Sequence, residues 1–259
     1  MRFGQEGACP MHEVVTRQEW LARRKAHLAK EKELTRAQDA LAAERRALPW
    51  VRIEKDYRFE APQGPVGLTD LFGRHSQLIV QHFMFGPDWE EGCVGCSFMA
   101  DHVEPAFRHL DHHDVAFAAV SRTSLAKIQA FRRRMGWTFR WVSSLNSDFN
   151  FDFDVSFTED DRERGDVYYN YAPQPYVCDE LPGISVFHKD AEGQVFHTYS
   201  TYARGDERLV GAYNFLDLTP FGRNENGPNG DLRDWVRHHD RYEAAGASTC
   251  ACHQEPVPA

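Results

Sequence analysis

The stretch that decides the fold runs from Gln77-Leu-Ile-Val-Gln-His-Phe-Met-Phe85 through Gly86-Pro87 to Cys93-Val-Gly-Cys96. The apolar run predicts a buried strand that ends at the Gly-Pro pair. From Ser97 to Asp111 the apolar residues fall near one stripe, which predicts a helix. The two thiols therefore stand where a strand gives way to a helix. A thiol in a first helical turn faces unpaired backbone N–H groups and the positive end of the helix dipole, which favour the thiolate.

A dithiol in this position suits either thiol–disulfide exchange or the binding of soft metal ions. In the redox interpretation, Cys93 is the attacking thiolate and Cys96 resolves the mixed disulfide, because residues three apart are neighbours in a helical turn. Glu90 and Glu91 act against this interpretation, since nearby negative charge raises the pKa of a thiol. We favour redox chemistry on a thiol or disulfide substrate and expect no metal or other cofactor.

Metal binding by the same cysteines is the alternative. Cys93, Cys96, Met99 and His102 follow one another at three-residue intervals, and their thiolate, thioether and imidazole groups suit Cu(I), with Zn(II) bound through Cys and His. His197, on a later predicted hairpin, is a further candidate ligand. A second candidate metal cluster consists of His238, His239, Cys250, Cys252 and His253.

Strands and helices alternate downstream of the dithiol, and the fold class is therefore α/β. Short links between the elements predict right-handed crossovers and a largely parallel sheet. Residues 143–181 break the alternation and are rich in aromatic residues, which indicates an insertion. The expected elements are strand Val115–Val120, a helix capped by Ser124 and running to about Met135, strand Phe139–Val142, a hairpin of Ile184–Phe187 with Val195–Thr201, and a helix near Glu207–Phe215.

A long helix precedes this region. Thr16-Arg-Gln-Glu19 fits a capping box, no Gly or Pro occurs from residue 17 to 47, and Pro49 ends the helix. About thirty residues at 1.5 Å each span about 45 Å. The leucine repeat on this helix is interrupted, which leaves two roles open: packing on its own domain or forming a homodimer. We expect a tail and helix over residues 1–48, a core domain over 49–243 and a flexible tail over 244–259.

The composition narrows the function classes. The chain has 259 residues and a net charge of −9, so it implies no basic surface and argues against binding to nucleic acid. No apolar run approaches the roughly 20 residues that cross a bilayer, so we expect no membrane association. The first residues lack the apolar segment of a secretion signal, and six cysteines in a chain of this length do not make a disulfide scaffold. We expect a cytoplasmic protein.

The order of strand, CxxC, helix, strand, helix, strand and hairpin resembles the thioredoxin fold. Leu181-Pro182-Gly-Ile-Ser-Val-Phe187 resembles the segment in which that family has a cis-proline before the strand that faces the dithiol. This resemblance implies that Pro182 lines the groove for the substrate's thiol or disulfide. A peroxiredoxin-like fold fits as well, but Glu90 stands where peroxiredoxins have a Thr or Ser that hydrogen-bonds the peroxide.

A closer resemblance covers roughly residues 14 to 242. Thr16-Arg-Gln-Glu-Trp20, Phe83-Met-Phe-Gly-Pro-Asp-Trp-Glu-Glu-Gly-Cys93, Ala119-Val-Ser-Arg122, His197-Thr-Tyr-Ser-Thr-Tyr-Ala-Arg-Gly205 and Trp235-Val-Arg-His-His-Asp-Arg-Tyr242 resemble a bacterial family catalogued as domain of unknown function 899. That family is described as predicted thioredoxin-like dithiol–disulfide oxidoreductases. The resemblance implies a thioredoxin-like fold with a long N-terminal helix and an aromatic-rich insertion. The expected site residues are Cys93 and Cys96 for catalysis and Pro182, Trp89 and Arg122 for contact with the substrate.

Overall fold

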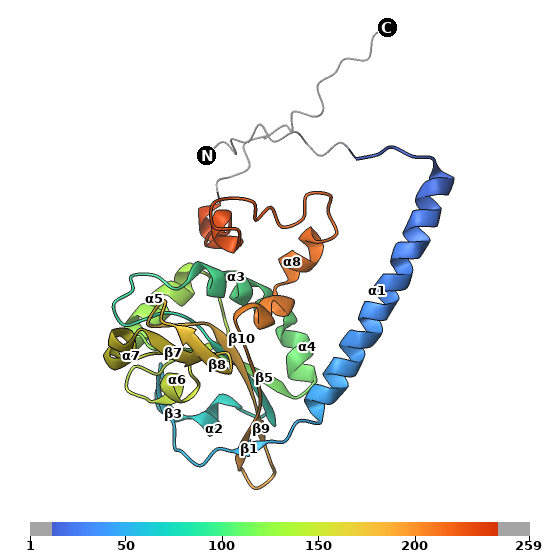
Figure 1. The fold of residues 1–259 in the computed structure, drawn as a ribbon. Coiled ribbons are helices and arrows are strands. Elements are labelled where there is room, and N and C mark those ends of the chain that lie inside the picture. Colours follow the sequence, from blue (N-terminus) through green and yellow to red (C-terminus); the bar gives the residue numbers. More distant parts are fainter. Residues whose placement is uncertain (1–11, 243–259) are drawn as a thin grey trace. The chain divides into compact units, whose positions relative to one another are not determined.

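The computed structural model describes residues 12–242, and the chain divides into two compact units, residues 1–49 and 50–259 (Figure 1). The first unit contains α1 (Arg17–Arg46). The capping box predicted at its start is present, since the backbone N–H of Thr16 donates to Glu19 Oε2 at 2.9 Å and that of Glu19 donates to Thr16 Oγ1 at 3.3 Å. The long helix is thus confirmed.

The second unit is built on an eight-stranded sheet in the order β1-β10-β9-β4-β5-β6-β2-β3. Strands β4, β5 and β6 are parallel neighbours, while β9 lies antiparallel to both β4 and β10. The strand before the dithiol thus lies between a parallel strand and the antiparallel hairpin, which is the topology of the thioredoxin-like fold, and the predicted fold class is confirmed. The expectation of a largely parallel sheet is wrong, because two of the strand pairings described in this sheet are parallel and five are antiparallel. The strands of this sheet are β1 (Val51–Arg52), β2 (Arg58–Ala61), β3 (Gly64–Gly67), β4 (Gln77–His82), β5 (Val115–Ser121), β6 (Arg140–Ser143), β9 (Gly183–Lys189) and β10 (Val195–Tyr202).

The two faces of the sheet carry different helices (Figure 1). Three helices connect the parallel strands and cover one face, and two short helices pack against the other. Right-handed crossovers explain this, because strands that follow one another in one direction place all their connecting helices on one side. The connecting helices are α3 (Val94–Val103), α4 (Phe107–His112) and α5 (Leu125–Arg134), and the two short helices on the other face are α2 (Leu68–Leu71) and α6 (Phe149–Asp152).

Strand β4 has apolar residues on both faces, with two buried polar exceptions. Leu78 and Val80 point into the core on the side of α2 and α6, and His82 follows them on that side. Ile79 packs on the other side, where Gln81 donates a hydrogen bond to the backbone of α3. A near-continuous apolar strand is expected of a parallel sheet covered on both faces. Gln81 and His82 are therefore the buried residues of β4 that need a hydrogen-bond partner.

The predicted helix from Ser97 to Asp111 is divided in the structure. Helix α3 begins earlier, at Val94, and its continuation is a 3-10 turn η1 (Glu104–Ala106) before α4. Pro105 explains the break, because proline has no N–H to donate to the preceding turn. Helix α5 has its predicted cap, with the backbone N–H of Lys127 donating to Ser124 Oγ at 3.4 Å.

The insertion over residues 143–181 has more regular structure than the sequence indicated. Besides α6 it contains α7 (Glu159–Arg164) and a two-stranded hairpin of β7 (Asp166–Tyr169) and β8 (Ala172–Pro175). After β10 the chain continues through η2 (Ala203–Leu209) and α8 (Gly211–Leu216), then η3 (Leu232–Asp234) and η4 (His239–Arg241). Among residues 12–242, no helix has both the length and the apolar character that crossing a bilayer requires.

Candidate active site

The two thiols of the CxxC sequence lie at the start of α3, as the sequence predicted. Cys93 is the N-cap residue, and its Sγ accepts a hydrogen bond from the backbone N–H of Cys96 at 3.5 Å. Cys96 is buried, and its Sγ accepts from the backbone N–H of Met84 at 3.4 Å. Cys93 remains partly exposed. The pair thus consists of one accessible thiol and one enclosed thiol.

Their surroundings separate the two pKa values. The hydrogen bond from the Cys96 thiol, together with the backbone N–H groups of Cys96 and Gly95, lowers the pKa of Cys93 to about 7. The same hydrogen bond, with burial and the charge of Cys93, raises the pKa of Cys96. Donors aimed at a sulfur favour the thiolate, and loss of solvent disfavours it. Near neutral pH, Cys93 is therefore the thiol that ionises more readily, and Cys96 holds its proton.

The acidic group that acts on this pair is Asp206, which no sequence motif indicated. Its charge raises the pKa of both thiols, and its own pKa is raised to about 6 by burial and by the neighbouring Glu207. The expectation that Glu90 and Glu91 would oppose the thiolate is wrong. Glu90 is almost fully exposed, and Glu91 accepts hydrogen bonds from Arg134 (2.7 Å) and Arg241, which neutralise it.

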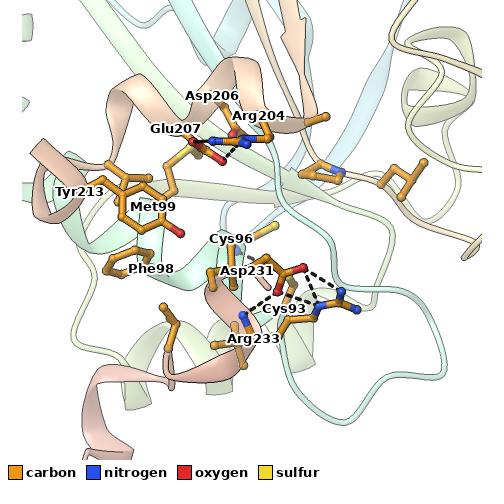
Figure 2. Close-up of a pocket in the computed structure, with 18 of the residues that line it drawn as sticks. Cys93, Cys96, Phe98, Met99, Arg204, Asp206, Glu207, Tyr213, Asp231 and Arg233 are labelled. Carbon is orange, nitrogen blue, oxygen red and sulfur yellow. Dashed lines mark hydrogen bonds and ion pairs between the residues drawn. The ribbon is translucent and has the colours of Figure 1, made fainter. Parts of the chain in front are cut away.

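A cavity of about 820 Å³ opens beside the dithiol. Figure 2 shows Phe98, Met99 and Tyr213 together on one side of it, with Arg204, Asp206 and Glu207 on the segment above. Most of its arginines are paired: Arg204 with Glu207 at 2.8 Å, and Arg233 with Asp231 at 2.7 Å. Further lining residues come from three separate parts of the chain: Gln81 and His82, then Leu181, Pro182 and Gly183, and finally Val210, Glu225, Leu232, Val236 and Arg237.

Pro182 lies in the wall of this cavity, but its peptide bond differs from the expectation. No residue from 12 to 242 is preceded by a cis peptide bond, so the cis-proline implied by the resemblance is wrong for this chain. Hydrogen bonds fix the trans segment, with the Leu181 N–H donating to Val155 O at 2.9 Å and the Tyr169 hydroxyl donating to Pro182 O at 2.7 Å. Tyr169 Oη also accepts from the N–H of Ala203 at 2.9 Å, so the β7–β8 hairpin supports two segments of the wall.

The other two expected substrate contacts lie away from the cavity wall. Trp89 packs beside Gly86, where an added Cβ would lie 2.9 Å from the indole Nε1. Arg122 donates to Glu180 Oε1 at 2.8 Å, and Glu180 also accepts from the Ser156 hydroxyl at 2.6 Å. Because Glu180 is almost fully buried, this ion pair holds the insertion to the end of β5. Arg122 is therefore held by Glu180 and does not line the cavity.

The alternative metal ligands do not converge. Both ring nitrogens of His102 are engaged within the protein, Nδ1 with Phe98 O at 2.7 Å and Nε2 with the N–H of Ala212 at 3.0 Å. His197 bonds Ser200 Oγ at 2.7 Å and packs on Phe153, which belongs to the core on the opposite face of the sheet. Within residues 12–242, no three His, Cys, Asp or Glu side chains are grouped as a metal site requires.

The second candidate metal cluster is also divided. His238 is buried, and its Nε2 hydrogen-bonds Gly92 O at 2.9 Å. His239 instead bonds Asp101 Oδ1 at 2.7 Å. The C-terminal segment is therefore docked on the loop that leads into the dithiol. The remaining members, Cys250, Cys252 and His253, lie outside the described residues.

Comparison with known proteins places the chain in a family. A family model described as "Bacterial protein of unknown function (DUF899)" matches residues 9–242. No curated protein matches. Among solved structures, peroxiredoxin Q from Xanthomonas campestris is similar, with 16% identity over 60% of this chain and 85% of that one and a TM-score of 0.41. Peroxidoxin BcpB from Mycobacterium tuberculosis has 11% identity over 65% and 96%, with a TM-score of 0.42.

Proposed function

This chain belongs to the DUF899 family of bacterial proteins of unknown function, and from that premise we propose that it is a thiol–disulfide oxidoreductase whose redox pair is Cys93 and Cys96. One observation carries the proposal: a partly exposed thiol whose pKa is lowered to about 7 caps a helix, and a buried thiol three residues later donates a hydrogen bond to it. A thiol with a pKa near ambient pH combines a large thiolate fraction with good nucleophilicity.

The reaction transfers two electrons from the dithiol to a disulfide. The Cys93 thiolate attacks one sulfur of R–S–S–R, the S–S bond breaks, and R–S⁻ leaves and takes a proton from water. Cys96 then loses its proton and attacks Cys93 Sγ. The mixed disulfide breaks, the second R–S⁻ leaves, and the Cys93–Cys96 disulfide forms. A dithiol reductant returns the pair to the thiol state in a further cycle.

We assign Asp206 as the base that accepts the proton of the Cys96 thiol. It lines the cavity with both thiols, and burial and Glu207 raise its pKa to about 6, which suits a carboxylate that accepts a proton near neutral pH.

Asp206→Asn should slow closure of the internal disulfide about tenfold or more, while the pKa of Cys93 falls because a negative charge is removed. Stopped-flow tryptophan fluorescence and alkylation measure the two effects, with Asp217→Asn as the control outside the cavity. Unchanged closure would contradict the assignment.

A redox titration tests the proposal as a whole. The protein is equilibrated at stepwise ratios of reduced to oxidised dithiothreitol, alkylated, and mapped by mass spectrometry. We expect a reversible disulfide between Cys93 and Cys96, and a stable mixed disulfide on Cys93 in the Cys96→Ser variant. Cys178→Ser is the control, because Cys178 lies in a loop outside the cavity lining. Failure of Cys93 and Cys96 to pair at any ratio would overturn the proposed function.

A further inference from the structure

The chain after β10 covers the dithiol. Residues 203–213 and 225–237 contribute most of the cavity wall that faces the start of α3. Contact with the CxxC sequence is direct, since a Cβ placed on Gly95 would lie 3.5 Å from both methyl carbons of Leu232. Figure 2 shows Asp231 and Arg233 of the same segment beside the cysteines. We call residues 225–237 the cover.

The cover is an ordered part of the fold. One carboxylate, that of Asp234, accepts the backbone N–H groups of Gly227 (2.9 Å), Asn229 (3.0 Å) and Gly230 (3.1 Å). Val236 is buried in the apolar cluster that contains Phe98 of α3. His238, just beyond the cover, bonds the loop before Cys93. The loop is thus folded around one aspartate and fastened to the elements that position the thiols.

This cover limits the size of a substrate. A protein disulfide reaches a dithiol only if an extended segment of the partner can lie across it, and here Leu232 lies against Gly95, between the two cysteines of the sequence. The volume of about 820 Å³ lies within the roughly 300–1,000 Å³ typical of small-molecule sites. The wall is largely apolar, with contributions from Phe98, Met99 and Val210. A small molecule with an apolar body fits this space.

Two residues that line the cavity carry a buried polar atom without a partner in the protein, Gln81 at Oε1 and His82 at Nδ1, and the ring of His82 packs on Phe149. Gln81 is 1% exposed and lines the cavity; its Nε2 donates to Cys96 O at 3.0 Å, and its Oε1 has no hydrogen-bond partner within the protein. A buried acceptor left unpaired costs free energy, so a ligand that donates a hydrogen bond there is favoured over one that cannot. Because Gln81 bonds the backbone of Cys96, that donor would lie close to the second cysteine of the dithiol.

We propose that the substrate is a low-molecular-weight disulfide with a largely apolar body and an O–H or N–H donor near its sulfur atoms, and that protein disulfides are excluded by the cover. This inference rests on the proposed function, because it names the substrate of the same dithiol. Cys93 attacks the small disulfide as described above, with the donor of the substrate bonded to Gln81 Oε1.

Rates with three disulfides test the substrate class. The reduced protein is mixed with bis(2-hydroxyethyl) disulfide, diethyl disulfide or insulin, and formation of the Cys93–Cys96 disulfide is followed. We expect the hydroxyethyl compound to react at least about fivefold faster than the ethyl compound, and insulin slowest, by about a hundredfold or more per disulfide. Equal or faster reaction with insulin would overturn the inference while leaving the proposed function intact. If no internal disulfide forms with any oxidant, the proposed function itself fails.

A matched pair of variants tests the role of Gln81. Gln81→Met keeps the length of the side chain and removes its oxygen, so the preference for the hydroxyethyl over the ethyl disulfide should disappear. Gln77→Met, on the exposed start of the same strand, should keep that preference. The ratio of the reaction rates with the two substrates is measured within one variant, so any effect of the substitution on the reactivity of Cys96 cancels. A preference that survives in Gln81→Met would contradict the assignment of Gln81.

Accessibility of Cys93 gives a test that does not depend on turnover. In the native protein, N-ethylmaleimide should label Cys93 much faster than a maleimide carried on a bulky polymer, whereas Cys178 should show a small difference. Leu232→Ala should reduce the difference between the rates at which the two maleimides label Cys93, and it should speed the reduction of insulin. Leu218 is an exposed leucine outside the cavity lining, so Leu218→Ala should change neither rate. Equal labelling of Cys93 by both reagents in the native protein would overturn the inference.

Discussion

At the scale of single residues, one helical turn makes two chemically different thiols. Cys93 receives hydrogen bonds from a thiol and from backbone N–H groups, and it stays partly exposed. Cys96 gives the hydrogen bond and is enclosed. A thiolate at the start of a helix is favoured by the unpaired N–H groups there. The proposed order of attack, Cys93 first and Cys96 second, rests on this difference in hydrogen bonding and exposure.

Removing the Cys96 thiol should raise the pKa of Cys93. The Cys96 thiol is the largest cause of the lowered pKa of Cys93, so Cys96→Ala should move that pKa from about 7 upward toward its ordinary value. The thiolate fraction at pH 7 then falls, and iodoacetamide should label Cys93 several times more slowly at that pH and equally fast well above pH 9. A pH series of labelling rates measures the shift. Cys178→Ser serves as the control, and an unmoved inflection would contradict the hydrogen-bond account.

At the scale of elements, a line of buried polar side chains crosses β4, β9 and β10. His82 bonds Ser185, Ser185 bonds Ser200, and Ser200 bonds His197, each at 2.7 Å. The aromatic rings of Phe149 and Phe153 pack on His82. Burial, with the neighbouring His197, lowers the pKa of His82 to about 3, and burial also lowers the pKa of His197. The sheet therefore folds around two neutral histidines.

Acid should destabilise this sheet. Above about pH 6.5 both histidines are neutral in the folded and the unfolded chain; below it the unfolded chain binds protons that the folded chain does not, so stability falls. Each histidine contributes a slope of at most about 1.4 kcal/mol per pH unit, and the contribution of His82 levels off near pH 3, where the folded state is protonated too. In urea titrations, His82→Gln should reduce the loss of unfolding free energy between pH 6 and pH 4. His109→Gln, at an exposed position, should retain it.

The same elements show what the sequence could predict. Local signals placed two helix starts well, at the Ser124 cap and at the capping box of Thr16, whereas α3 begins at Val94, three residues before the predicted Ser97. The placement of the β7–β8 hairpin and of the cover beside the dithiol has no such signal, because Tyr169 bonds Ala203 and Leu232 contacts Gly95, which are residues far apart in the chain. Asp206 follows Cys96 by more than a hundred residues, and only the folded chain brings both to one cavity.

At the scale of the whole molecule, the two units differ in how their stability arises. The second unit buries an aromatic and aliphatic core on both faces of its sheet. Helix α1 has no buried residue. Its Leu34 and Leu41 are 59% and 51% exposed, and they lie two turns apart on one side of the helix. Helices draw most of their stability from packing an apolar face. We propose that α1 packs against α1 of a second copy.

Analytical ultracentrifugation of the full chain tests this arrangement. The native protein should sediment as a dimer, and the double variant Leu34→Lys, Leu41→Lys should sediment as a monomer, because two charges replace the shared apolar side. Ala29→Lys with Ala43→Lys adds equal charge on the opposite side of α1 and should leave the dimer intact. The urea midpoint of the second unit should be the same in all three proteins, since the substitutions lie outside it. A native protein that stays monomeric across micromolar concentrations would remove the helix from any role in assembly.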